Sequence, residues 1–126
     1  MKLIIAGSRT FKNIDADTIN RFIKLFGLHP NEVVSGGATG VDASGEWYAK
    51  SKRLPIKTFK ADWDEFGKAA GPIRNKEMAQ YADALLLIWD GTSRGSMSMK
   101  TEMLALGKPV HELIVRSYEP EYPDAA

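Results

Sequence analysis

The sequence predicts a doubly wound α/β fold, in which helices cover both faces of a mainly parallel five-stranded sheet. Short apolar runs alternate with segments of helical periodicity along the 126 residues. The apolar runs are nearly continuous, which is typical of strands that are covered on both faces. Two of these runs lead into glycine- and hydroxyl-rich loops directly before a helix. In open α/β sheets, such strand-to-helix junctions are where ligands bind.

The composition is that of one globular domain. Hydrophobic residues make up 44% and charged residues 26% of the chain, a balance that excludes a disordered or collagen-like protein. A chain of this length buries a single core. We therefore expect one domain over residues 1–116, followed by a frayed tail over residues 117–126, which contain two prolines.

The net charge and the absence of cysteine bear on which partners, metal sites and cofactors this chain can have. The formal net charge is +1, whereas binding to a nucleic acid duplex usually needs a basic stripe, so a nucleic-acid partner is not favoured. The chain has no cysteine, and His29 and His111 are isolated, so we expect no metal site and no cofactor. The apolar runs are too short for a signal peptide or a membrane span, which favours a cytoplasmic protein without a membrane partner.

The first strand and helix follow from local patterns. Residues 2–7 contain four consecutive apolar residues before a glycine, which predicts a buried strand. Apolar residues then recur at helical spacing, and Gly27 stands where a helix C′ glycine belongs. Asp15 or Asp17 is the expected N-terminal cap of this helix.

The middle of the chain continues the alternation. A short β-branched strand at residues 33–34 leads through a glycine loop into a helix over residues 41–51. Residues 56–59 predict a third strand. Residues 61–71 mix acids, aromatics and glycine, which favours a long loop, and a helix over residues 72–82 follows with a proline in its first turn.

The last part of the chain completes the sheet. Residues 84–89 form the clearest strand, and the loop at 90–98 opens a fourth helix that ends at Gly107. Residues 109–115 supply the last strand. Because the carboxyl ends of parallel strands meet at one edge of a sheet, we expect the loops after the first, second and fourth strands to converge on one crevice.

The two glycine loops are the candidate phosphate sites. They read SGGATGVD from Ser35 and DGTSRGSMS from Asp90. Backbone N–H groups at a helix N-terminus bind anions, and glycine lets a phosphate approach closely. Neither loop has the GxGxxG or GxxxxGK[ST] spacing, so a tight turn that binds nothing is the alternative. The predicted ligand-binding residues of these loops are Ser35, Gly36, Gly37, Thr39, Gly40, Asp42, Asp90, Gly91, Gly95 and Ser96.

Further candidates flank these loops. Gly7, Ser8 and Arg9 follow the first strand, and the Arg9 guanidinium suits phosphate oxygens. Arg74 and Asn75 lie in the first turns of a helix, where a cation works against the dipole and an anionic ligand would explain it. The alternative for both arginines is a solvated side chain or an exposed ion pair.

Acidic and aromatic residues are less specific signals. Asp42 could hold a ligand ribose, but an acid in the first turn of a helix is also favoured by the dipole. Glu46 can pair with Lys50 on the same helix. Trp63, in a polar segment, is a better candidate for stacking on a base than Trp89, for which core packing is equally compatible.

Four ordered blocks resemble a known family. GSRTF, SGGATGVD, ADWDEFGKAAGPIRN and ADALLLIWDGTSRGSMSM occur in this order. Together they resemble the YspA-like branch of the SLOG superfamily, which also includes the DNA-processing protein DprA (Smf) and the LOG phosphoribohydrolases. The resemblance spans residues 3–115 and implies a Rossmann-like sheet with a nucleotide-related ligand over the two glycine loops. LOG-like proteins form dimers through helices beside the site, so a homodimer is also implied.

The resemblance to the LOG enzymes indicates which residues catalysis would need. They cleave the N-glycosidic bond of a nucleoside monophosphate with a glutamate and an arginine. The arginine corresponds to Arg74, and Gly95 with Ser96 corresponds to the glycine–threonine step of the LOG loop. The glutamate position falls on Met99, which cannot transfer a proton. Glu102, three residues further along, replaces it only if the ligand sits differently.

Three functions therefore stay open. The first is a module that binds a nucleotide or a nucleotide-derived phosphosugar between the two loops. The second is a nucleoside-monophosphate N-glycosidase in which Glu102 and Arg74 are catalytic, which predicts release of free base. The third is DprA-like binding of single-stranded nucleic acid, which a gel shift would detect.

Overall fold

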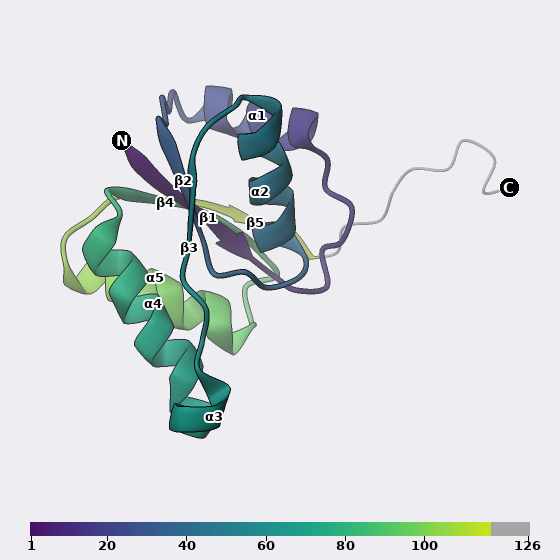
Figure 1. Cartoon of the computed structure of the whole chain (residues 1–126). Helices are drawn as coiled ribbons and strands as arrows, with labels where there is room; N and C mark the ends of the chain where they lie inside the picture. The colour runs from purple at the N-terminus through teal and green to yellow at the C-terminus, as the bar shows by residue number, and fades with distance from the viewer. Residues whose placement is uncertain (117–126) are drawn as a thin grey trace, which may run out of the picture.

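A five-stranded sheet, parallel throughout, forms the centre of the molecule (Figure 1). The computed structural model describes residues 1–116, so the predicted frayed tail lies outside the described residues. The strand order is β3-β2-β1-β4-β5. The strands are β1 (Lys2–Gly7), β2 (Glu32–Ser35), β3 (Ile56–Thr58), β4 (Ala84–Trp89) and β5 (Val110–Ile114). The predicted doubly wound, Rossmann-like α/β fold is confirmed.

Helices cover both faces of the sheet. Figure 1 shows α1 and α2 on one face and α4 and α5 on the other. The helices are α1 (Ala16–Leu25), α2 (Val41–Ser51), the short α3 (Trp63–Phe66), α4 (Ala70–Tyr81) and α5 (Arg94–Ala105), and a 3₁₀ turn (Gly67–Ala69) joins α3 to α4. Among the described residues, no helix combines the length and the apolar character that crossing a membrane requires.

The central strand divides the core into two layers. Leu3 and Ile5 of β1 pack into the layer under α1 and α2, whereas Ile4 packs into the layer under α4 and α5. All three side chains are fully buried. This alternation is the period-2 pattern of a strand, and it explains why the sequence of β1 is apolar at consecutive positions rather than at every second one.

The helix boundaries follow from caps that the sequence predicts. Asp15, not Asp17, caps α1, and its carboxylate accepts a hydrogen bond from the Thr18 N–H at 2.8 Å. Gly27 and Gly107 follow the ends of α1 and α5 with φ of +65° and +67°, a conformation that glycine adopts without strain. Both predicted glycine stops are confirmed.

The segment predicted as a loop over residues 61–71 is largely helical. Asp62 caps α3 by accepting a hydrogen bond from the Glu65 N–H at 3.1 Å. Helix α4 then begins at Ala70, ahead of Pro72. Proline is compatible with this position because the first N–H groups of a helix have no intrahelical partner. As a result, α3 places Trp63 beside α4, where a Cβ added to Gly71 would lie 3.4 Å from the Trp63 ring.

A pair of helical glycines tests the packing of α2 on β1. A Cβ added to Gly45 in α2 would lie 2.7 Å from the Ile5 Cβ, whereas a Cβ added to Gly95 in α5 would meet nothing within 4 Å. We expect Gly45→Ala to lower the free energy of unfolding by about 1–3 kcal/mol. Gly95→Ala should raise it by about 0.5–1 kcal/mol, because alanine favours the helix. Urea unfolding measures both, and a Gly45→Ala variant as stable as the parent would contradict the packing.

Candidate functional site

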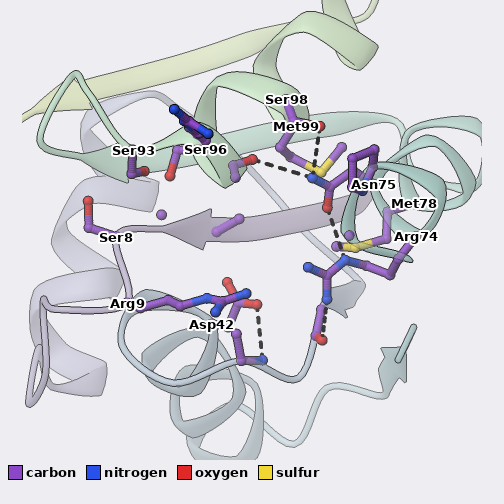
Figure 2. Close-up of a pocket in the computed structure, with 18 of the residues that line it drawn as sticks. Ser8, Arg9, Asp42, Arg74, Asn75, Met78, Ser93, Ser96, Ser98 and Met99 are labelled. Atoms are coloured by element: carbon purple, nitrogen blue, oxygen red, sulfur yellow. Dashed lines mark hydrogen bonds between the residues drawn. The ribbon is translucent and has the colours of Figure 1, made fainter. Parts of the chain in front are cut away.

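A cavity of about 530 Å³ opens at the carboxyl edge of the sheet. Its walls come from the loops after β1, β2 and β4, from α4 and from the start of α5 (Figure 2). Predicted site residues that line the cavity are Gly7, Ser8, Arg9, Gly36, Asp42, Arg74, Asn75, Asp90, Gly95 and Ser96. The loops therefore converge in one crevice, as the order of the strands requires.

Several predicted residues do not line this cavity. Gly37 and Thr39 line a smaller neighbouring hollow instead. Ser35, Gly40, Gly91 and Glu102 line neither space. Glu102 is partly buried on α5, whereas Met99 on the same helix is buried and lines the cavity. The structure thus does not bring Glu102 to the other predicted residues.

The loops after β1, β2 and β4 are joined by backbone contacts that exclude a Cβ at two glycines. A Cβ added to Gly7 would lie 1.7 Å from the Ile88 carbonyl oxygen, and one added to Gly40 would lie 2.4 Å from that of Ser8. The Ser8 hydroxyl oxygen accepts a hydrogen bond from the Asp90 N–H at 3.1 Å. Gly40 therefore serves close packing between loops, and the sequence could not distinguish this role from ligand binding.

Two backbone N–H groups of the first glycine loop are hydrogen-bonded to side chains of the same segment. The Gly37 N–H donates to the Ser35 hydroxyl at 3.1 Å, and the Ala38 N–H donates to the Asp42 carboxylate at 3.2 Å. The Ser35 hydroxyl in turn donates to Glu46 at 2.7 Å. The expectation that the N–H groups of this loop are free for phosphate needs correction at these two positions, because the chain's own oxygens occupy them.

A chain of hydrogen bonds crosses the crevice from this loop to α5 (Figure 2). Arg74 donates from Nη1 to the Gly36 carbonyl at 2.6 Å and from Nε to the Asn75 side-chain oxygen at 3.0 Å. The Asn75 amide donates to the Gly95 carbonyl at 3.3 Å and to the Ser98 hydroxyl at 3.2 Å. Asn75 is therefore fully engaged and positions Arg74, whose Nη2 has no partner among the described residues.

The N-terminus of α5 also has unsatisfied polar groups in the cavity. The Ser96 hydroxyl is buried, with its residue 5% exposed, and it has no hydrogen-bond partner among the described residues. Ser93, the N-cap residue, makes no side-chain cap bond. Ser8, Ser93 and Ser96 lie at the same end of the cavity in Figure 2. A buried hydroxyl without a partner is costly unless a ligand or water satisfies it.

Asp90 holds the turn that leads into this helix. Its carboxylate accepts hydrogen bonds from the N–H groups of Thr92 and Ser93, both at 2.9 Å. These backbone bonds favour the ionised form and lower the pKa of Asp90 below its ordinary value. Asp90 thus fixes the shape of the second glycine loop, because its carboxylate is bonded to backbone N–H groups of that loop.

Asp42 is the buried carboxylate of the cavity. It is 7% exposed, and burial raises its pKa from 3.8 to about 6, against the opposing effects of the Ala38 N–H and the Arg74 guanidinium. Burial also lowers the pKa of Arg74, and the Asp42 carboxylate opposes that shift. Arg9 extends toward Asp42 in Figure 2. The two arginines therefore bracket one carboxylate and leave the site with excess positive charge.

Trp63, which the sequence favours for stacking on a base, lines the cavity and is 52% exposed. Other lining residues had no ligand role predicted from the sequence. The apolar side of the cavity includes Pro72, Met78 and Met99. Ser93 and Ser98 add hydroxyls. The loop DGTSRGSMS contains both serines, but only the helix geometry shows which hydroxyls face the cavity. Trp89 is buried and donates to Glu112 at 2.7 Å.

The fold and the site define a class of protein, a Rossmann-like α/β domain with its crevice at the carboxyl edge of the sheet. The structure of DprA from Streptococcus pneumoniae shares this fold, with a TM-score of 0.67 and 18% sequence identity over 86% of this chain. The matched region is 48% of the DprA chain, so this protein spans about half the length of that neighbour. The likeness shows that the two proteins share a fold.

The chain belongs to the family of the Gene 61 protein of Mycobacterium phage D29. The two proteins are 33% identical over 121 residues, covering 86% of this chain and 93% of the phage protein. No protein-family model matches the chain. The relationship therefore shows the family of this protein but does not indicate a ligand.

The pKa of Asp42 predicts a pH-dependent stability. The native carboxyl binds its proton more tightly than the unfolded chain does, because its pKa is about 6 rather than 3.8. The resulting stabilisation is complete below the ordinary pKa and is lost as the pH rises through about 6. Its full size is about 3 kcal/mol.

Comparison with Asp42→Asn isolates the contribution of this carboxyl group to the pH dependence. Asparagine does not titrate, but its amide oxygen can still accept the hydrogen bond from the Ala38 N–H. We expect the free energy of unfolding of the parent to fall relative to that of Asp42→Asn between about pH 4 and pH 7. Urea unfolding across this range measures the difference. Parallel pH profiles for the two proteins would contradict a buried Asp42.

Proposed function

We propose that this domain binds a nucleotide whose phosphate group lies at the N-terminus of α5. The observation that carries the proposal is the buried Ser96 hydroxyl, which faces the cavity without a partner among residues 1–116. Helix α5 has 12 residues, long enough for a full dipole at its N-terminus. A phosphate oxygen is the acceptor that this position lacks.

Backbone donors surround the same point. The Met97 N–H donates to the Ser93 carbonyl at 3.1 Å and begins the bonding of the helix. The N–H groups of Arg94, Gly95 and Ser96 therefore precede the first intrahelical bond and are available to an anion. The first turn of α5 contains no acidic residue, so no side chain of that turn competes with a phosphate for these donors.

The remainder of the cavity suits a nucleoside. Its volume of about 530 Å³ falls within the range of small-molecule sites, roughly 300–1,000 Å³. Met78 and Met99 supply apolar surface, and the exposed ring of Trp63 is available for stacking on a base. Polar groups at one end and an apolar wall at the other match a phosphate joined to a base through a sugar.

We also propose that this family falls within the YspA-like branch of the SLOG superfamily. Each of the four sequence blocks that carry the resemblance contributes residues to the cavity, among them Arg9, Gly36, Arg74 and Ser96. A cluster built from all four blocks supports one shared ligand site. The small nucleotide-like ligand and the cytoplasmic location expected from the sequence belong to the same proposal.

The two alternative functions have less support from the geometry. For N-glycosidase activity, the cavity has Met99 where the LOG enzymes have their glutamate, and Glu102 does not line the cavity. For single-stranded nucleic acid, the likeness to DprA concerns the fold, and the net charge of +1 does not favour a nucleic-acid partner. Nucleotide binding is therefore the proposed function.

Ser96→Ala tests the phosphate site. We expect the affinity for a nucleoside monophosphate to fall about tenfold or more, because a hydrogen bond to a charged group is worth about 1.5–3 kcal/mol. Calorimetry with a panel of nucleoside monophosphates measures this. Thr101→Ala on the same helix is the matched control, because Thr101 is exposed and lines neither space. A parent protein that binds no member of the panel would overturn the proposal.

Trp63→Ala tests the base site. Loss of stacking should weaken nucleotide binding by about 1–3 kcal/mol, whereas the affinity for inorganic phosphate should not change. Trp47→Ala is the control, because Trp47 is comparably exposed on α2 at 45% and lies outside the cavity. Equal affinities of the parent and Trp63→Ala for the nucleotide would remove Trp63 from the site.

A further inference from the structure

A second hollow of about 410 Å³ adjoins the main cavity. It lies between the loop after β2 and the segment after β3. The residues that line this hollow and not the main cavity are Gly37, Thr39, Lys60 and Ala61. Five lining residues are shared with the main cavity, namely Arg9, Gly36, Ala38, Trp63 and Arg74. The two spaces are therefore parts of one trough, and Trp63 stands at their border.

The charge of the second hollow is one-sided. Arg9, Lys60 and Arg74 line it, and no carboxylate is among its lining residues. Within residues 1–116, the ion pair present is Lys100 with Glu112, so none of these three cations is neutralised by direct pairing. Asp42, which Arg9 and Arg74 flank in the main cavity, offsets one of these three charges. A protein of net charge +1 thus still gathers excess positive charge around one small space, an arrangement that attracts anions.

Two backbone donors of the hollow are already occupied. The Gly37 and Ala38 N–H groups are bonded to Ser35 and Asp42, so an anion here depends mainly on side-chain charge. Gly37 has φ of +72°, and a Cβ added to it would meet Thr58 at 3.3 Å and Lys60 at 4.0 Å. The glycine thus leaves room for Lys60 to lie beside the loop.

We infer that this hollow is a second anion subsite, so that the ligand is a small nucleotide with two separate phosphate groups. One phosphate lies at the N-terminus of α5, the nucleoside contacts Trp63, and the second phosphate lies among Arg9, Lys60 and Arg74. The inference rests on the proposed nucleotide-binding function. A nucleoside bisphosphate represents this class. A longer nucleic acid strand is disfavoured because Arg9, Lys60 and Arg74 line one small hollow rather than an extended basic stripe.

Calorimetry with AMP and adenosine 3′,5′-bisphosphate tests the inference. We expect the parent protein to bind the bisphosphate about tenfold tighter than AMP, because it gains one further charge-assisted contact. Lys60→Met keeps the aliphatic stem and removes the charge. It should abolish this advantage while its affinity for AMP stays within about twofold of the parent. Lys76→Met, at an exposed position on α4 outside both spaces, should change neither affinity.

The outcomes separate the two proposals. AMP binding without any preference for the bisphosphate would overturn the second subsite and leave the proposed function standing. Failure to bind either compound would overturn both. A loss of AMP affinity in Lys60→Met, with its melting temperature unchanged, would place Lys60 in the first subsite instead. If a single-stranded oligonucleotide bound more tightly than the bisphosphate and depended on Lys60, the trough would belong to a nucleic acid.

Discussion

The change of direction at β1 is the constraint on which the site depends. The chain leaves β1 and β2 toward the face that α1 and α2 cover, and it leaves β4 toward the face that α5 covers. Since β1 and β4 are neighbours in the sheet, their loops separate above the sheet and leave a space between them. Gly7 and Gly40 allow the surrounding loops to pack closely at the base of that space.

The hydrogen-bond chain through Arg74 makes the crevice a fixed shape. It links the Gly36 carbonyl, Arg74, Asn75 and the Gly95 carbonyl across the opening. A Cβ added to Gly36 would lie 2.6 Å from the Arg74 Nη1, so glycine at this position lets the guanidinium reach the Gly36 carbonyl without being displaced. Helix α4 begins at Ala70, so Arg74 lies beyond its first turn, and burial rather than the helix dipole is what disfavours the charge. The Gly36 carbonyl and the nearby Asp42 offset this cost. Because these groups are ordered before a ligand arrives, binding loses less conformational entropy.

The sequence predicted those features that local patterns determine. Continuous apolar strands, the Asp15 cap and the glycine stops at Gly27 and Gly107 each depend on residues close together in the chain. The α3 turn was missed because its cap, Asp62, stands in a segment rich in acids, aromatics and glycine that resembles a loop. The placement of Trp63 beside Gly71 followed from that turn and could not be read without it.

The roles of the two glycine loops could not be separated by pattern, because both place glycines and hydroxyls before a helix. The two loops differ in whether the first turn of the following helix contains a carboxylate. Helix α2 has Asp42 in its first turn, and this buried side chain accepts a hydrogen bond from the Ala38 N–H. The first turn of α5 has no acid, and its Ser96 hydroxyl is buried without a partner among the described residues.

An acid at a helix N-terminus stabilises the dipole by itself, whereas a helix without one leaves that stabilisation to an external anion. By this reasoning the first loop is a closed junction that shapes the crevice and positions positive charge, and the second is the open end to which a phosphate can bind. Under the proposed function, the same motif thus contributes structure at one strand end and the phosphate site at the other, and the presence or absence of an acid in the first helical turn distinguishes the two.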